Sequence, residues 1–269
     1  MKLSIQIVNY NSRECLRECI ASLLPFISRN SGNVEIIVIN NDADPIGDFL
    51  NHLDLGSEVF RVLEINKNIG FGKAHNKGIP ASSGSFVMFL NPDTRIEGGS
   101  LDKMLAVFET DQKIAVIGPL LFNRENKVQK DCYGFKKTPF SIISSKLKKN
   151  NWLPENIKFF EVDWVSGGAM MIRRDALSAI GGFDENYFMY FEDIDLCLRA
   201  VNQGWKVVVN PEARIFHESG KSFASEKEKK KHYYASQNYY LHKNYGQASA
   251  LLAKLLRFPY YLKNVYLKK

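Results

Sequence analysis

The sequence lacks any run of eighteen apolar residues, which excludes a helix that crosses a bilayer by itself. Its four cysteines include no CxxC pair, so neither a disulfide framework nor a zinc ribbon is indicated, and buried reduced thiols are expected. Internal repeats and low-complexity linkers are also missing. Because 45% of the 269 residues are hydrophobic and 24% are charged, the composition is globular, which excludes disordered and fibrous classes.

The positive charge is concentrated near the C-terminus. Residues 221–269 hold eleven Lys or Arg and two Glu, a net charge of +9, whereas residues 1–220 hold 25 basic and 27 acidic residues, a net charge of −2. A basic tail favours anionic surfaces. Because the rest of the chain is nearly neutral, a nucleic-acid groove is not expected.

The first residues bear on location. Polar Gln6 interrupts what would be the apolar part of a secretory signal, and Asn9 and Asn11 follow it. We therefore expect a first β-strand here and a cytoplasmic protein, which the basic tail could hold at the inner face of the cell membrane.

Short apolar runs alternate with amphipathic segments in the first half. We expect buried strands at Leu3–Val8, Val34–Ile39, Val59–Ile65 and Phe86–Leu90, and a helix from Cys15 that ends at Pro25. This alternation predicts an α/β fold with a mostly parallel sheet covered by helices on both faces. Asn, Asn-Asn-Asp, Asn-Lys-Asn and Asn-Pro-Asp follow the four strands, at the edge where open α/β sheets bind ligands.

The second half has a different pattern. Residues 123–160 are polar and Lys-rich, as expected for an excursion over the site. Further strands are expected at Val162–Val165, Ala169–Ile172, Val207–Val209 and Ile215–His217, with a helix over Ile194–Val201. A single catalytic domain is the simplest organisation.

Four groups of residues could carry chemistry. Asp93 in Asn91-Pro92-Asp93 could hold a divalent cation that also binds phosphates, although the same sequence forms ordinary turns. Glu192, Asp193 and Asp195 follow an aromatic run, where mutual repulsion and poor solvation favour a raised carboxyl pKa and a general base. The alternative is a helix start that carries acidic residues.

The other two groups are ambiguous by themselves. His217 at a strand end could complete a cation site or be structural. Gly70 and Gly72, followed by Lys73, could bind a diphosphate at a helix N-terminus or could form a tight turn.

Taken in order, the motifs resemble those of family 2 glycosyltransferases over roughly residues 3–245. The nucleotide-sugar half carries Ser4-Ile5-Gln6-Ile7-Val8-Asn9-Tyr10-Asn11-Ser12, Val38-Ile39-Asn40-Asn41, Asn68-x-Gly70-Phe71-x-x-x-x-Asn76-x-Gly78 and Leu90-Asn91-Pro92-Asp93. The acceptor half carries Ser166-Gly167-Gly168-Ala169-Met170, Gly181-Gly182-Phe183-Asp184-Glu185, Phe191-Glu192-Asp193-x-Asp195-Leu196 and His217-x-x-Gly220-Lys221-Ser222. The resemblance implies a GT-A-type, Rossmann-like domain over 1–225, with halves 1–122 and 123–225, and a basic helical tail over 226–269.

The resemblance also implies roles for single residues. Asp193 would be the catalytic base, and Asp93 and His217 would bind Mg²⁺ or Mn²⁺. Nucleotide-sugar binding would fall to Val8, Asn9, Tyr10, Asn40, Asn68, Gly70, Phe71, Asn76, Asn91 and Asp93, and acceptor binding to Gly167, Gly168, Glu192 and Asp195. Asn40 stands where the family usually has an Asp that contacts the base; because an amide both donates and accepts, the nucleobase stays open.

The pattern is most similar to bacterial rhamnosyltransferases that use dTDP-L-rhamnose. This implies inverting sugar transfer to a saccharide or lipid-linked saccharide in cell-surface polysaccharide synthesis, such as that of a lipopolysaccharide O-antigen. A UDP-hexose or UDP-N-acetylhexosamine donor is the alternative, and a non-catalytic sugar-binding module is a more remote one. Residues 247–269 interleave basic, aromatic and aliphatic residues, which suits either an anionic membrane surface or packing on the domain.

Overall fold

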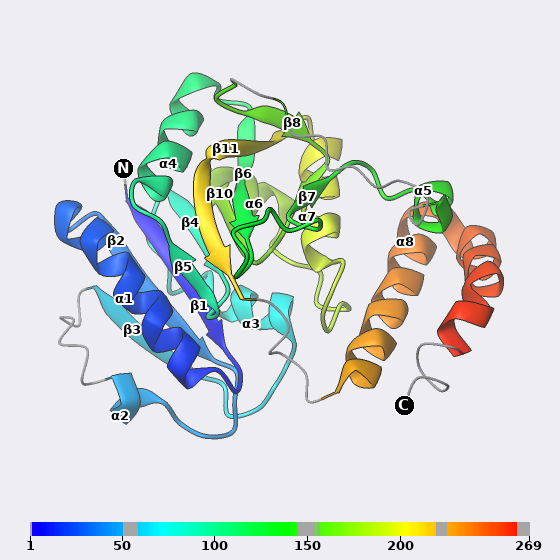
Figure 1. Ribbon diagram of the computed structural model, residues 1–269, viewed down its shortest axis with the longest axis horizontal. Helices are drawn as coiled ribbons and strands as arrows, with labels where there is room; N and C mark the ends of the chain where they lie inside the picture. The colour runs from blue at the N-terminus through cyan, green and yellow to red at the C-terminus, as the bar shows by residue number, and fades with distance from the viewer. Residues whose placement is uncertain (1, 51–58, 145–153, 155–156, 219–224, 263–269) are drawn as a thin grey trace.

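A mixed sheet organises the chain in the computed structural model, which describes residues 2–50, 59–144, 154, 157–218 and 225–262 (Figure 1). Its strands are β1 (Leu3–Asn9), β2 (Val34–Asn40), β3 (Phe60–Glu64), β4 (Phe86–Leu90), β5 (Thr94–Ile96), β6 (Ile114–Phe122), β8 (Phe160–Val162), β10 (Ala169–Arg173) and β11 (Lys206–His217). A separate pair joins β7 (Tyr133–Gly134) to β9 (Trp164–Val165). The helices are α1 (Arg13–Arg29), α2 (Gly47–Leu50), α3 (Phe71–Gly78), α4 (Ser100–Thr110), α5 (Pro139–Ser144), α6 (Arg174–Ile180), α7 (Glu192–Asn202) and α8 (Glu226–Leu262).

The sheet confirms the α/β expectation. Its order is β3-β2-β1-β4-β10-β6-β11-β5, with β8 paired to β11. β1, β2, β3, β4, β6 and β11 point one way, whereas β5, β8 and β10 oppose them, so the sheet is mixed but mostly parallel. β10, from the second half of the chain, lies between β4 and β6 of the first half.

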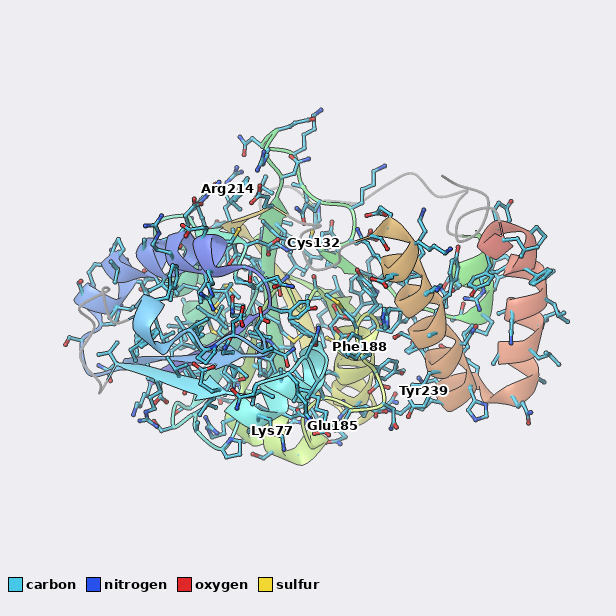
Figure 2. All side chains as sticks on the ribbon, turned by 90° about the horizontal axis from the view of Figure 1, so that it is seen from below. Lys77, Cys132, Glu185, Phe188, Arg214 and Tyr239 are labelled. Atoms are coloured by element: carbon cyan, nitrogen blue, oxygen red, sulfur yellow. The ribbon has the colours of Figure 1, made fainter. Side chains whose placement is uncertain are left out.

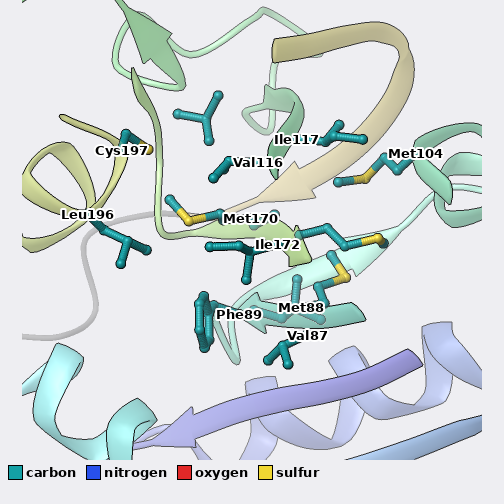
Figure 3. Close-up of a cluster of buried hydrophobic side chains, with 14 of the residues drawn as sticks. Val87, Met88, Phe89, Met104, Val116, Ile117, Met170, Ile172, Leu196 and Cys197 are labelled. Atoms are coloured by element: carbon teal, nitrogen blue, oxygen red, sulfur yellow. The ribbon is translucent and has the colours of Figure 1, made fainter. Parts of the chain in front are cut away.

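Helices cover both faces of the sheet because side chains alternate along each strand. Phe86 of β4 stacks on Phe108 of α4, with ring centroids 4.5 Å apart. Phe89 points to the other face, where its ring meets His75 of α3. Figure 3 shows Met170 of β10 between this Phe89 and α7. The polar residues that follow each parallel strand are therefore left at the edge between these layers.

The structure corrects three sequence expectations. α1 does not end at Pro25 but continues to Arg29, because Pro25 is exposed while the following Phe26 and Ile27 are buried in the core. The two strands expected around residues 207–217 form the single strand β11, which has a register shift between Asn210 and Arg214. β3 is a half-buried edge strand instead of a buried one.

α8 bends sharply at Gly246, whose φ is 82°. The first half packs on the domain through buried Tyr240 and Leu241. The second half folds back along the first, where Tyr261 meets the ring of Tyr234 at 5.3 Å, and forms the outermost helix in Figure 1. Among the described residues, no helix combines the length and hydropathy that crossing a bilayer requires.

Candidate functional site

A pocket opens at the carboxyl edge of the parallel strands, where the sequence predicts a ligand site. Its lining includes seven residues expected to bind a nucleotide-sugar: Val8, Tyr10, Asn68, Gly70, Phe71, Asn91 and Asp93. The rest of the lining comes from Ser12, Asn41, Pro92, Phe188 and Met189. The pocket therefore combines the ends of β1, β2 and β4 with the loop before α7.

Asp93 and His217 meet beside this pocket. β5 pairs with β11 so that His217 lies opposite Thr94, the residue after Asp93. The Nε2 atom of His217 is 3.3 Å from Oδ1 of Asp93, and both side chains are largely buried. Asn91 reaches the same Nε2 through its Nδ2 atom at 3.2 Å.

Gln129 determines which nitrogen of His217 carries the proton. Its Nε2 donates to the backbone carbonyl of His217 at 2.7 Å, so its Oε1 must face Nδ1 of the ring, which is 2.9 Å away. An amide oxygen only accepts, and Nδ1 is therefore protonated. In the neutral ring the Nε2 lone pair then faces the Asp93 carboxylate.

These residues fit a divalent cation. A carboxylate oxygen and an imidazole nitrogen with its other nitrogen held by a hydrogen bond form a typical ligand pair. Within the described ranges, no group of three or more His, Cys, Asp or Glu side chains is placed to bind a metal. Mg²⁺ commonly takes only one or two protein ligands and completes its shell with water and substrate phosphates.

The turn Gly167-Gly168 connects Asp193 to the pocket and to the pair formed by Asp93 and His217. Its Oδ2 accepts the N–H of Gly167 at 2.9 Å, and its Oδ1 accepts the N–H of Ile194 at 2.8 Å. A Cβ on Gly167 would lie 3.1 Å from the ring of Phe71, and one on Gly168 would lie 3.3 Å from His217. Asp193 and His217, one of the expected metal ligands, therefore contact adjacent glycines of the same turn.

Burial controls the acidity of the carboxyl groups here. Burial raises the pKa of Glu192 well above its usual range, and repulsion from Asp193 adds to this effect. Burial also raises the pKa of Asp193, although hydrogen bonds from Gly167 and Ile194 oppose the shift. Both carboxyl groups therefore bind a proton more readily than exposed carboxyl groups do.

Asn9 and Asn40 lie beneath the pocket, fully buried. Asn9 donates to the amide oxygen of Asn40, whose Nδ2 donates to the carbonyl of Asp44 and to Glu64. These bonds use both protons of the Asn40 amide, and Asn40 is not among the residues that line the pocket.

Asn76 and Asp195 also make internal contacts. Asn76 bonds both the N–H and the carbonyl of Phe183, which ties α3 to the second half of the chain. Asp195 is 0% exposed and pairs with Arg199 and Lys243, so it holds helices together and does not line the pocket.

The N-terminus of α3, expected either to bind a diphosphate or to form a tight turn, already makes contacts within the fold. The N–H of Phe71 donates to the carbonyl of Phe188 at 3.0 Å, and Lys73 pairs with Glu185 at 3.2 Å. Gly70 is required for another reason, because its φ is 95° and a Cβ would lie 2.6 Å from the Phe188 oxygen.

Two positions of the candidate site, Asn41 and Gln129, were not predicted from the sequence. Asn41 belongs to the motif Val38-Ile39-Asn40-Asn41 but was given no role there, and it bonds Asn68 and Ile69 beside the pocket. Gln129 falls in a polar segment without periodicity. The expected motif residues Gly220, Lys221 and Ser222 lie outside the described residues.

Comparison with known proteins gives consistent matches. The family model "Glycosyl transferase family 2" matches residues 4–181, and "N-terminal domain of galactosyltransferase" matches residues 158–222. The N-acetylglucosaminyl-diphospho-decaprenol L-rhamnosyltransferase of Mycobacterium tuberculosis is 29% identical over 186 residues, which cover 60% of each chain. Rhamnosyltransferase WbbL of Escherichia coli K12 is 30% identical over 162 residues, which cover 56% of this chain and 59% of WbbL. The chain thus spans about 60% of the length of these relatives.

Among solved structures, GalNAc-T7 with UDP, GalNAc and Mn²⁺ superposes with a TM-score of 0.65 at 15% identity, covering 98% of this chain and 57% of GalNAc-T7. At this identity the match speaks for the fold alone, and it agrees with the layered sheet described above.

Proposed function

The chain belongs to glycosyl transferase family 2, and from that premise we propose that it is an inverting glycosyltransferase that depends on a divalent cation. The observation that carries the proposal is that the expected metal ligands and the expected base lie at the same turn. His217, which is paired with Asp93, lies against Gly168, and Asp193 accepts a hydrogen bond from the adjacent Gly167. A cation-held leaving group and a proton acceptor would therefore lie near the same turn, beside the pocket that Asp93 lines.

On the donor side, Asp93 and His217 would hold Mg²⁺ or Mn²⁺. When bound, the cation would stabilise the negative charge that develops on the departing nucleoside diphosphate. Asn41, Asn68 and the glycine at position 70 shape the wall against which the nucleotide would lie.

On the acceptor side, Asp193 would accept the proton of the attacking hydroxyl. Its hydrogen bonds with Gly167 and Ile194 fix the direction of the carboxylate, and burial raises its pKa towards that of an effective base. One base suffices for direct displacement, which inverts the anomeric carbon, so no covalent sugar intermediate is needed.

For the donor we propose dTDP-L-rhamnose, because both curated relatives above are named as rhamnosyltransferases. Inversion of the β-linked donor would then produce an α-L-rhamnoside. A UDP-hexose or UDP-N-acetylhexosamine is the second candidate, since both amide protons of Asn40 are used within the fold and do not select a base. The mycobacterial relative is named for a saccharide on diphospho-decaprenol, which makes a lipid-linked saccharide the proposed acceptor class.

The base assignment is tested with Asp193→Asn. We expect kcat to fall by roughly 10²- to 10⁴-fold with little change in donor affinity, because only proton transfer is lost. Asp175→Asn is a matched control: Asp175 also bonds the N–H of the next residue at a helix start but is exposed. A fully active Asp193→Asn enzyme would remove the base assignment.

The donor is identified by a thermal-shift panel. Because a ligand that binds only the folded state raises the melting temperature, dTDP-, UDP- and GDP-sugars are compared with and without Mg²⁺ or Mn²⁺. Asp93→Ala should abolish the metal-dependent part of the shift. A metal-independent shift of equal size would contradict the cation site.

We also propose that the second half of α8 contacts an anionic membrane from the cytoplasmic side. Its small residue Ala253 is buried and Ala250 is half-buried, whereas five large apolar residues are more than half exposed: Leu251, Leu252, Leu255, Leu256 and Phe258. Lys254 lies on the same helix, within the +9 segment. An apolar face with basic neighbours is typical of interfacial helices.

This contact is tested by vesicle co-sedimentation. The full chain should bind vesicles that contain phosphatidylglycerol, and both deletion of residues 247–269 and the double change Leu251→Ser, Leu255→Ser should reduce binding. Vesicle binding that survives the deletion would refute the proposal, as would a concentration-dependent dimer that buries the same face.

A further inference from the structure

The turn directly before α7 has an unusual backbone. Tyr190 and Phe191 have φ values of 71° and 69°, in the left-handed region that residues with side chains rarely occupy. Phe191 is the N-cap of α7, and Glu192 and Asp193 follow at once. The direction of the Asp193 side chain therefore depends on a conformation that the turn would not adopt without support from its surroundings.

Aromatic residues of α8 supply part of that support. The ring of Tyr233 lies 5.8 Å from the ring of Tyr190 and 5.4 Å from that of Phe191. Tyr240, which is 1% exposed, packs on Phe191 with centroids 5.3 Å apart. Such contacts depend on ring shape, so they hold the two left-handed residues in one arrangement.

Hydrogen bonds from α8 fix the rest of the same loop. Ser236 donates to the carbonyl of Met189 at 2.7 Å, and Tyr239 donates to Asp184 at 3.0 Å. Figure 2 shows Phe188 beside the first half of α8, where Tyr239 is labelled. Phe188 and Met189 line the donor pocket, so this helix also holds part of the pocket wall.

Lys243 extends the contact to α7 itself. Its ammonium group bonds Asp184 at 2.8 Å and Asp195 at 2.7 Å. Asp195 is fully buried, and its carboxylate also accepts from Arg199 and Tyr187. Because Asp195 lies two residues after Asp193, Lys243 ties α8 to the first turn of the helix that carries the base.

We propose that the first half of α8, residues 226–245, is a positioning element of the active site, and that Tyr233 and Lys243 are its positioning residues. The inference rests on the proposed role of Asp193 as the base. It divides α8 at Gly246 into one half that holds the loop 184–191 and Asp193 and one half that is available to a membrane. The functional unit of the nucleotide-sugar domain then extends through residue 245.

The test uses substitutions in the full chain. Tyr233→Ala removes the ring that touches both left-handed residues, and Tyr233→Phe restores it. Tyr260→Ala is the matched control, because Tyr260 is on the second half of α8 and is 49% exposed, compared with 39% for Tyr233. Lys243→Met and Lys254→Met form a second pair on the two sides of Gly246.

Transfer to a soluble acceptor analogue is measured together with the donor Kd and the melting temperature. We expect Tyr233→Ala and Lys243→Met to lower kcat on the order of tenfold or more, since displacements near 1 Å have such effects. The donor Kd should be nearly unchanged, and Tyr233→Phe and both second-half controls should keep the wild-type kcat.

Several results would overturn the inference. They are an unchanged kcat in Tyr233→Ala and Lys243→Met, an equal loss in Tyr233→Phe, or a loss in the controls as well. A fall in kcat that disappears after correction for the folded fraction would also count against it. Failure of the proposed function is distinguishable, because it appears as an active Asp193→Asn enzyme regardless of the α8 variants.

Discussion

Acidification is expected to destabilise the fold through one buried histidine. His75 is 0% exposed, and its ring is in contact with Phe71 and Phe89 at centroid distances of 4.6 and 4.8 Å. Its Nδ1 faces the amide oxygen of Gln6 at 3.1 Å. The Gln6 amide nitrogen donates to Ser82, so the oxygen must face the ring and Nδ1 carries the proton.

Within the part of the chain that the structure describes, Nε2 of His75 has no hydrogen-bond partner. A second proton there would create a buried, unpaired charge, and burial accordingly lowers the pKa of His75 to about 3 from 6.5. Between these values the unfolded chain binds a proton that the folded protein does not, so stability is lost as the pH falls from 6.5 towards 3.

The size of the effect follows from the two pKa values. pH 5 is about 1.5 pH units below the pKa of the unfolded state, so protonation stabilises the unfolded state by about 2 kcal/mol. The folded state gains almost no free energy from protonation at this pH. At pH 7.5 the same contribution is about 0.1 kcal/mol or less.

Urea unfolding at pH 7.5 and pH 5.0 measures this loss in the wild type and in His75→Asn, whose amide can still donate to Gln6. We expect the wild type to lose about 2 kcal/mol more than the variant over this interval. Other titrating groups are common to both proteins and cancel in the difference. Equal losses in the two proteins would show that His75 is not held neutral in the folded state.

Three further predictions concern the site. Gly70→Ala should abolish donor binding and should lower the melting temperature more than Gly181→Ala does, as measured by thermal shift. Both glycines have positive φ, but of the two only Gly70 lies against another residue's backbone. Gln129→Met should weaken Mn²⁺ binding roughly 10- to 100-fold in calorimetry or electron paramagnetic resonance titrations, since it releases the ring of His217; an unchanged affinity would contradict the tautomer argument. The kcat/KM profile should lose activity on its acid side at a higher pH than an ordinary aspartate would cause, because burial raises the pKa of the base Asp193 and only its ionised form accepts a proton.

The sequence was a good guide to local structure where one signal dominated. The continuous apolar runs gave β1, β2 and β4 almost to the residue. The predicted helix end at Pro25 was wrong, because burial of Phe26 and Ile27 outweighs the tendency of proline to end a helix. No local pattern reveals that burial. The pairing of β10 with β4 and β6 could not be derived, because strand direction and neighbours depend on contacts distant in sequence.

The candidate site was predictable to a similar degree. The resemblance of motifs indicated that Asp93 and His217 act together, and the structure places them 3.3 Å apart. The saturation of Asn40 by Asn9 and Glu64 was not visible, since it requires knowing which of several amides face one another. Gln129 gave no signal because a single amide in an irregular segment has no periodicity.

The place of β10 between β4 and β6 limits how such an enzyme can change its specificity. A strand from the later half of the chain completes the sheet of the earlier half, so neither half can be excised and replaced as a cassette without leaving unpaired backbone. New donors or acceptors must then arise by exchanging side chains and loops at the rim, on a framework inherited whole. Engineered hybrids should accordingly graft loops and not halves.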